Sequence, residues 1–158
     1  MALDQGQNRI IQQQKLNIFL VIKFYMQVIE GVELLTHAAH EDKMGSLVAL
    51  EEQSGLPFVP RRIFHITVSD SSCIRAGHAG TSEELIIAMT GTVTVELRNG
   101  MQQASLRLDD NKKSLWIRPG IWLRFTEFSQ GTVLLVIASL TYAETQHFSR
   151  PQPLWQVD

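Results

Sequence analysis

The sequence contains a single cysteine, Cys73, among its 158 residues, so the chain cannot form an internal disulfide. This scarcity favours a reducing compartment, and we expect the protein in the cytoplasm. Only 19% of the residues are charged and the formal net charge is −2, so no basic surface is expected for nucleic acid. The chain also lacks the roughly 20 consecutive apolar residues of a membrane span. Lys23 and Gln27 interrupt the apolar segment that begins at Ile18, and no secretory cleavage site follows it.

Hydrophobic residues, at 44%, suffice for one domain with a core. After residue 45 the sequence indicates about eight short strands with frequent turns and no long amphipathic helix. The stretch 92–98 alternates polar and apolar side chains, which is the period of a half-buried strand. Asn99-Gly100 follows it and predicts a type I′ hairpin turn, in which both central residues have positive φ. Further strand-like runs lie at residues 47–50, 62–68, 104–108, 115–117, 122–125 and 132–137. The pattern predicts an all-β fold, a small antiparallel β-barrel or jelly roll.

Residues 1–31 form a separate accessory segment in this interpretation, and residues 32–158 form the main domain. The segment is rich in glutamine at first and then apolar. We expect a helix or an added strand that packs on the barrel or on a partner subunit; attachment to a membrane surface is the alternative.

A spaced motif follows the predicted strand at 62–68. It reads Gly77-His78-Ala79-Gly80, then Glu84, then Gly91. Cupins carry a first motif of Gly, His-x-His, Glu and Gly at these spacings, and here the second histidine is Gly80. Residues two apart in a strand face the same side, so His78 and position 80 are both expected to face the mouth of the barrel.

Too few metal ligands remain in this motif to predict a metal centre. Only His78 and Glu84 are left of the usual set, and residues 117–124, where a second cupin motif would lie, contain no histidine. A tight Zn²⁺ or Fe²⁺ site needs three or four protein ligands, so we expect no metal and no other cofactor. His37 and His40 could share a helical face, but no third ligand accompanies them, and solvated side chains are the simpler interpretation.

Several pieces of the chain then match one cupin family in order and spacing. They are residues 45–52, 56–58, 61–66, 75–79, 119–122, 128–129, 138–139 and 142–145. Over about 70% of its length the chain resembles the WxcM-like sugar-nucleotide 3,4-ketoisomerases, which are RmlC-like cupins acting on dTDP-4-keto-6-deoxyglucose. The resemblance implies an isomerase of deoxysugar and polysaccharide biosynthesis, with a nucleotide-sugar substrate and a homodimeric assembly.

The chemistry that the resemblance implies is metal-free proton transfer. Moving a ketone from C4 to C3 requires proton removal at C3 and delivery at C4 through an enediol, and imidazole is suited to this near neutral pH. His78 maps to the first of the family's two catalytic histidines. Glu84 or His65 would have to substitute for the second, which is Gly80 here.

The binding residues implied by the resemblance are basic or aromatic. Arg75 is expected to bind the pyrophosphate or stabilise the enediolate, and Arg62 to lie near the barrel mouth. Trp122 is expected to stack on a base or sugar. Outside the resemblance, Arg124 is a further candidate for substrate binding, and His65 in its strand is a candidate for lining the site.

Two departures from the family pattern, Gly80 and Leu123 in place of histidines, leave alternatives open. One alternative is a catalytically inactive cupin that binds a nucleotide sugar. Another is a cupin for a different small molecule, with its pocket rebuilt around Trp122 and Arg124.

Overall fold

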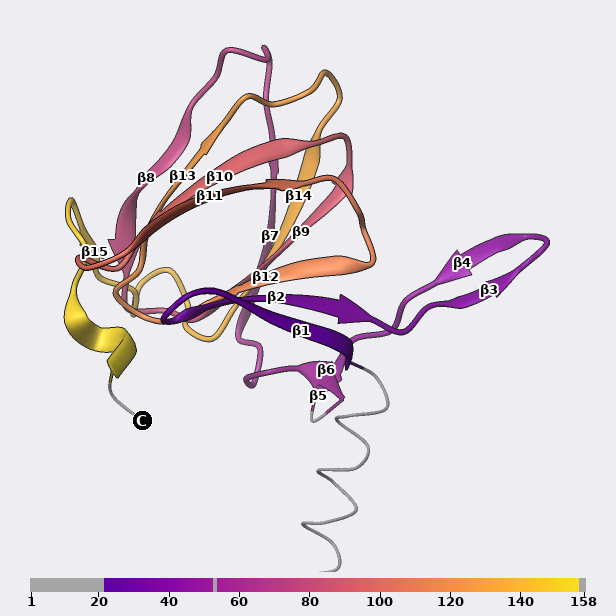
Figure 1. The fold of residues 1–158 in the computed structure, drawn as a ribbon, viewed down its shortest axis with the longest axis horizontal. Helices are drawn as coiled ribbons and strands as arrows, with labels where there is room; N and C mark the ends of the chain where they lie inside the picture. The colour runs from indigo at the N-terminus through magenta and orange to yellow at the C-terminus, as the bar shows by residue number, and fades with distance from the viewer. Residues whose placement is uncertain (1–21, 53, 157–158) are drawn as a thin grey trace, which may run out of the picture.

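The computed structural model describes residues 22–52 and 54–156, which fold into two facing antiparallel β-sheets (Figure 1). The six-stranded sheet has the order β1-β2-β12-β9-β14-β7 and the five-stranded sheet the order β11-β10-β13-β8-β15. The bounds of the first sheet are β1 Ile22–Ile29, β2 Val32–His37, β12 Lys113–Ile117, β9 Glu84–Thr90, β14 Val133–Ala138 and β7 Arg62–Thr67. Those of the second are β11 Gln103–Leu108, β10 Val93–Arg98, β13 Trp122–Thr126, β8 Arg75–Gly80 and β15 His147–Phe148. This arrangement confirms the predicted all-β jelly roll of the cupin type.

Alternation along the strands builds the core between the two sheets. In β10, Val93, Val95 and Leu97 are fully buried, and the residues between them face outward. Their cluster continues into the opposite sheet through Ile86 and Val136. The two sheets are therefore held together because each buries one apolar face against the other.

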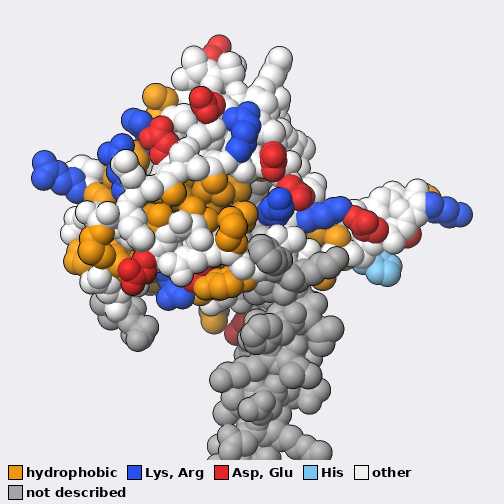
Figure 2. All heavy atoms as spheres, in the orientation of Figure 1, with side chains coloured by type: hydrophobic (Ala, Val, Ile, Leu, Met, Phe, Trp, Pro, Cys, Tyr) orange, Lys and Arg blue, Asp and Glu red, His pale blue; other side chains and the backbone are white. Residues whose placement is uncertain are grey.

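Two small elements lie outside the sandwich. The hairpin β3 (His40–Asp42) and β4 (Gly45–Leu47) stands out from the body of the molecule, and its side chains are exposed (Figures 1 and 2). The pair β5 (Glu51–Glu52) and β6 (Gly55–Leu56) lies beneath the six-stranded sheet, where neighbouring apolar residues cover the outer face of that sheet around Leu85 and Leu35. A 3₁₀ turn, Pro153–Gln156, packs Trp155 into the core.

Three details differ from or refine the sequence predictions. The described part of the accessory segment, β1, is a strand that pairs with β2, while residues 1–21 lie outside the described residues. The expectation that His37 is solvated was wrong, because His37 lies in β2, is buried, and its Nε2 is 2.6 Å from the Ser114 hydroxyl. The type I′ turn was also wrong: Gly100 has positive φ but Asn99 does not, and the Asn99 side chain accepts hydrogen bonds from two following backbone amides instead.

Candidate active site

A cavity of about 330 Å³ opens at the end of the sandwich where β7, β8, β9 and β15 meet. A second cavity of about 180 Å³ adjoins it and shares Phe64, His78 and Glu84 with the first. The wall of the first cavity is completed by Arg62, Tyr142 and His147, and that of the second by Arg75 and apolar residues such as Ile66, Leu123 and Phe125. His78 and Glu84, predicted from the motif, thus face one space.

A β-bulge in β8 positions two of the predicted residues on the same side. β13 pairs Leu123 with His78 but Arg124 with Ala76, so Gly77 is the extra residue. Without the bulge Arg75 and His78, three residues apart, would face opposite sides of the sheet. Gly77 has a φ of 85° and Ala76 a φ of 62°, a conformation that alanine rarely adopts. The strained bulge is what brings Arg75 into the cavity that His78 also lines.

The imidazole of His78 is half-buried and favours its neutral form. Burial lowers its pKa, and the positive charge of nearby His147 lowers it further. Its Nδ1 is buried and accepts or donates no hydrogen bond within the described residues. A buried polar atom without a partner is uncommon in native proteins, and here it belongs to a side chain that lines the cavity.

The carboxyl group of Glu84 comes from the first residue of β9 and is largely buried, with 17% of its side chain exposed. Burial raises its pKa to about 7, and Arg62 of β7, whose guanidinium is 3.8 Å away, opposes that increase. The Arg62 guanidinium also lies over the rings of Phe64, at 4.6 Å, and Tyr142, at 5.6 Å. Glu84 is therefore a buried carboxyl group held against a cation at the wall of the cavity.

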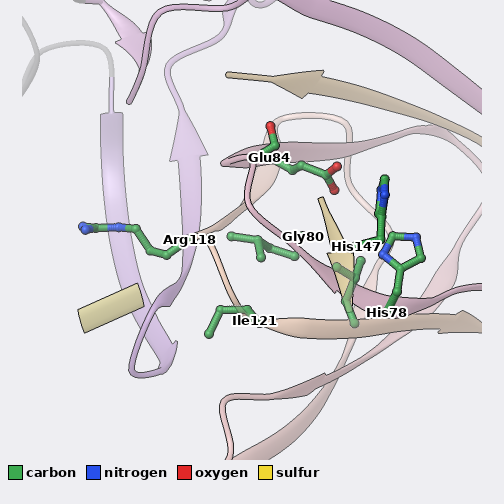
Figure 3. Close-up of a pocket in the computed structure, with 9 residues that line it drawn as sticks. His78, Gly80, Glu84, Arg118, Ile121 and His147 are labelled. Atoms are coloured by element: carbon green, nitrogen blue, oxygen red, sulfur yellow. The ribbon is translucent and has the colours of Figure 1, made fainter. Parts of the chain in front are cut away.

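A second imidazole, not found by sequence reasoning, faces that of His78. The ring of His147, from β15, meets the His78 ring edge-on with 4.7 Å between their centroids, and the Tyr142 ring is also near it, with 5.8 Å between centroids. In Figure 3 the two imidazoles and the Glu84 carboxylate gather on one side of the pocket while Arg118 extends away from them. The sequence offered one faint signal, that His147 is the sole histidine after His78.

The structure does not bring three predicted residues to the cavity. His65 alternates with Arg62 and Phe64 in β7 and is exposed on the opposite face of the sheet. Trp122 pairs with Ala79 rather than with His78, so it lies on the outer face of its sheet, between the guanidinium groups of Arg98 and Arg124.

Arg124 is the third of these residues, and it makes a 2.7 Å ion pair with Glu96 on that outer face. In all three cases the physical reason is that successive side chains of a strand point to opposite faces of the sheet, and these residues fall on the face away from the cavity.

Two further observations describe the molecule. Within residues 22–52 and 54–156, no three His, Cys, Asp or Glu side chains are grouped so as to hold a metal ion. The same part of the chain holds no helix with the length and apolar character needed to cross a membrane.

The fold and the site together define a cupin with a cavity at one end of its jelly roll, lined by two imidazoles and a buried carboxyl group. Residues 30–153 match the family model described as FdtA, WxcM-like, C-terminal. The chain belongs to this family. It is 32% identical over 107 residues to a TDP-4-oxo-6-deoxy-alpha-D-glucose-3,4-oxoisomerase from Aneurinibacillus thermoaerophilus, a match that covers 67% of this chain and 77% of the relative.

Solved structures agree with this assignment. The WlaRB TDP-quinovose 3,4-ketoisomerase from Campylobacter jejuni matches with a TM-score of 0.73 and 30% identity, over 77% of this chain and 95% of that one. A mutant of the QdtA 3,4-ketoisomerase from Thermoanaerobacterium thermosaccharolyticum, in complex with TDP-4-keto-6-deoxyglucose, matches with a TM-score of 0.73 and 28% identity, over 77% of this chain and 89% of that one. The epimerase RmlC from Legionella pneumophila, at 14% identity and a TM-score of 0.65, shares the fold.

Proposed function

We propose that the protein is a sugar-nucleotide 3,4-ketoisomerase that converts a dTDP-4-keto-6-deoxyhexose into its 3-keto isomer. The observation that carries this proposal is the pairing, in one cavity of a chain of this family, of an imidazole with a buried carboxyl group whose pKa is about 7. The three relatives from Aneurinibacillus, Campylobacter and Thermoanaerobacterium are 3,4-ketoisomerases or 3,4-oxoisomerases. The sugars that these relatives are named for, or are bound to, are TDP-linked, which supports the same substrate class here.

His78 and Glu84 are suited to the proton transfers that the reaction needs. An imidazole whose pKa is lowered by burial is neutral near pH 7 and can accept a proton from carbon. A carboxyl group with a pKa of about 7 is present in both forms, so it can donate a proton to the oxygen at C4 and accept one from the hydroxyl at C3. Half-buried surroundings strengthen these interactions relative to water.

Arg62 and Arg75 are proposed to bind the anionic parts of the substrate. Arg62 lies at the wall of the larger cavity, and its Nε is buried with no hydrogen-bond partner among the described residues. A guanidinium there can stabilise the negative charge that develops on the enediolate oxygens. Arg75 is exposed at the rim of the adjoining cavity, where a pyrophosphate would remain partly hydrated. Tyr142, which is also exposed at the mouth, offers an aromatic face for a base or sugar ring.

The test is incubation with dTDP-4-keto-6-deoxyglucose, with NMR detection of the 3-keto product. The wild-type chain is expected to form the product, and His78→Asn to lower kcat by roughly 10²- to 10⁴-fold, the usual contribution of a general acid–base group. His40→Asn serves as a matched control, because His40 is exposed on the projecting hairpin. Binding of dTDP to each variant, measured by calorimetry, reports whether the pocket is intact. Saturable binding without any product from the wild-type chain would contradict the proposed activity.

We further propose a cytoplasmic homodimer acting in deoxysugar biosynthesis. The single cysteine supports a reducing compartment. β1 and β7 are the edge strands of the six-stranded sheet, and exposed edges are usually covered in native proteins. Tyr25 and Met26 of β1 are half-exposed apolar side chains at that edge, which supports pairing with a second copy. Sedimentation equilibrium of the purified chain tests the dimer, and a monomer at micromolar concentration would contradict it.

A further inference from the structure

His147 lies directly opposite Gly80 in the antiparallel pair β15–β8. Side chains of directly opposed residues point to the same face of a sheet, with Cβ atoms about 4.5–5.5 Å apart. Residues 78 and 80 also share a face, because they are two apart in β8. The His147 side chain therefore occupies the same surface that a side chain at position 80 would share with His78. The 4.7 Å separation of the two imidazole centroids is the result.

The glycine at position 80 leaves the space beside His147 open. A Cβ built on Gly80 would approach no neighbouring atom closer than 3.7 Å, which is ordinary van der Waals contact. Neither steric crowding nor a left-handed backbone therefore requires glycine there. Both His147 and Gly80 line the narrow inner pocket that also holds Glu84 and His78 (Figure 3).

The segment before β15 holds His147 in place by defined contacts. The Gln146 carbonyl accepts a hydrogen bond from the Thr81 amide at 3.1 Å, and the Gln146 amide donates to the Thr81 hydroxyl at 3.0 Å. One turn earlier, Glu144 accepts a bond from the Thr141 hydroxyl at 2.8 Å and pairs with Arg61 at 2.8 Å. These contacts fix the backbone that leads into His147, which lowers the entropic cost of holding its side chain beside His78.

We propose that His147 is a second catalytic residue, which transfers a proton at one of the two reacting carbons while His78 serves the other. This inference rests on the proposed function and extends it to a residue on a different strand. His147 is exposed at the cavity mouth, so it can exchange protons with water between turnovers, whereas His78 is half-buried. Two imidazoles in contact across one cavity allow removal and delivery to be divided between them.

The proton transfers balance without any other reagent. One imidazole removes the hydrogen at C3 as a proton, and the electron pair of that bond forms the C3–C4 double bond while the oxygen at C4 takes the proton of Glu84. The other imidazole, in its protonated form, then donates to C4. The hydroxyl at C3 returns a proton to Glu84, and its oxygen becomes the new ketone. Each imidazole is restored by exchange with water.

The experiment compares His147→Asn with the wild type in the NMR assay for the 3-keto product. We expect kcat to fall by about 10²-fold or more while KM changes only a few-fold. Exposed His40, replaced by asparagine, is the matched control. Because His147 is at the surface, the variant is expected to fold, and retained dTDP binding will verify it.

A second part of the experiment moves the imidazole from position 147 of β15 to position 80 of β8. We expect the double variant Gly80→His with His147→Ala to be at least tenfold more active than Gly80→Ala with His147→Ala. If the wild type is active and its His147→Asn variant keeps kcat within about threefold, this inference alone is overturned. The same holds if Gly80→His with His147→Ala is no more active than Gly80→Ala with His147→Ala. A wild type that forms no 3-keto product would overturn the proposed function together with the inference.

Discussion

The rings of His147 and His78 meet edge to face in the cavity, although 69 positions separate the two residues in the chain and they lie on different strands. The contact is electrostatic as well as steric, because a charge on His147 lowers the pKa of His78. Replacement of His147 by asparagine removes that charge, so we predict that the pKa of His78 rises toward its ordinary value of 6.5 without reaching it, since burial still lowers it. Titration of the imidazole resonances by NMR measures the change, and an unchanged or lower pKa would contradict the coupling.

Glu84 is predicted to make the stability of the fold fall as the pH rises from about 4.5 to 7. In the folded chain its carboxyl group keeps the proton up to a pKa of about 7, whereas in the unfolded chain it releases it near 4.5. The folded state binds more protons in this range, so its free energy of unfolding decreases with pH, by on the order of 3 kcal/mol for a lone group. Glu84→Gln should remove this component. Urea titrations of both proteins at pH 5 and pH 8 provide the comparison; equal pH dependence in the two would count against a raised pKa.

Arg62 opposes the effect of burial on Glu84. We predict that Arg62→Gln raises the pKa of Glu84 above about 7, because the nearby positive charge that favours the carboxylate is lost. Arg61→Gln is the matched control, since the neighbouring arginine pairs with Glu144 at the surface instead. Carbon-13 NMR of the side-chain carboxyl groups reads the titration directly. A pKa of Glu84 that responds equally to both substitutions would show that the 3.8 Å pair has no specific role.

Gly91, the last residue of the sequence motif, is predicted to be required by the fold rather than by the chemistry. Its φ is 71°, and a Cβ there would clash with the Thr132 hydroxyl and lie 2.7 Å from that of Ser129. Both hydroxyls accept hydrogen bonds from the Thr92 amide. Gly91→Ala should therefore destabilise the protein by on the order of 2–4 kcal/mol. Gly131→Ala is the control, because its φ is 75° with open space around it, and it should cost only about 1–2 kcal/mol. Similar midpoints in thermal melts of the two variants would refute the steric argument.

Sequence patterns predicted the sheets better than they predicted the site. Alternation over residues 92–98 located β10 and its inward face, and the motif spacing placed His78 and Glu84 in one cavity. The patterns could not show the bulge at Gly77, which determines the side of the sheet on which Arg75 lies. A bulge shifts the alternation of side chains along a strand without any change in residue types.

The misplaced and missed residues share a related cause. Trp122 was predicted to lie in the pocket from the family resemblance and Arg124 from the alternative of a rebuilt pocket, but the alternation of side chains along β13 turns both outward. His147 was missed because β15 is only two residues long and its register with β8 is a tertiary contact. When two strands that are far apart in the sequence pair, neither segment shows a periodic pattern that predicts the pairing.

Running the reaction in heavy water and measuring deuterium at C4 of the 3-keto product tests directly whether His78 and His147 divide proton removal and delivery between them. Proton transfer by separate groups predicts that the hydrogen delivered to C4 comes from a side chain in exchange with solvent, so nearly every product molecule should carry deuterium there. A product that retains the original C3 hydrogen at C4, with no deuterium from solvent, would contradict the division of proton removal and delivery between His78 and His147.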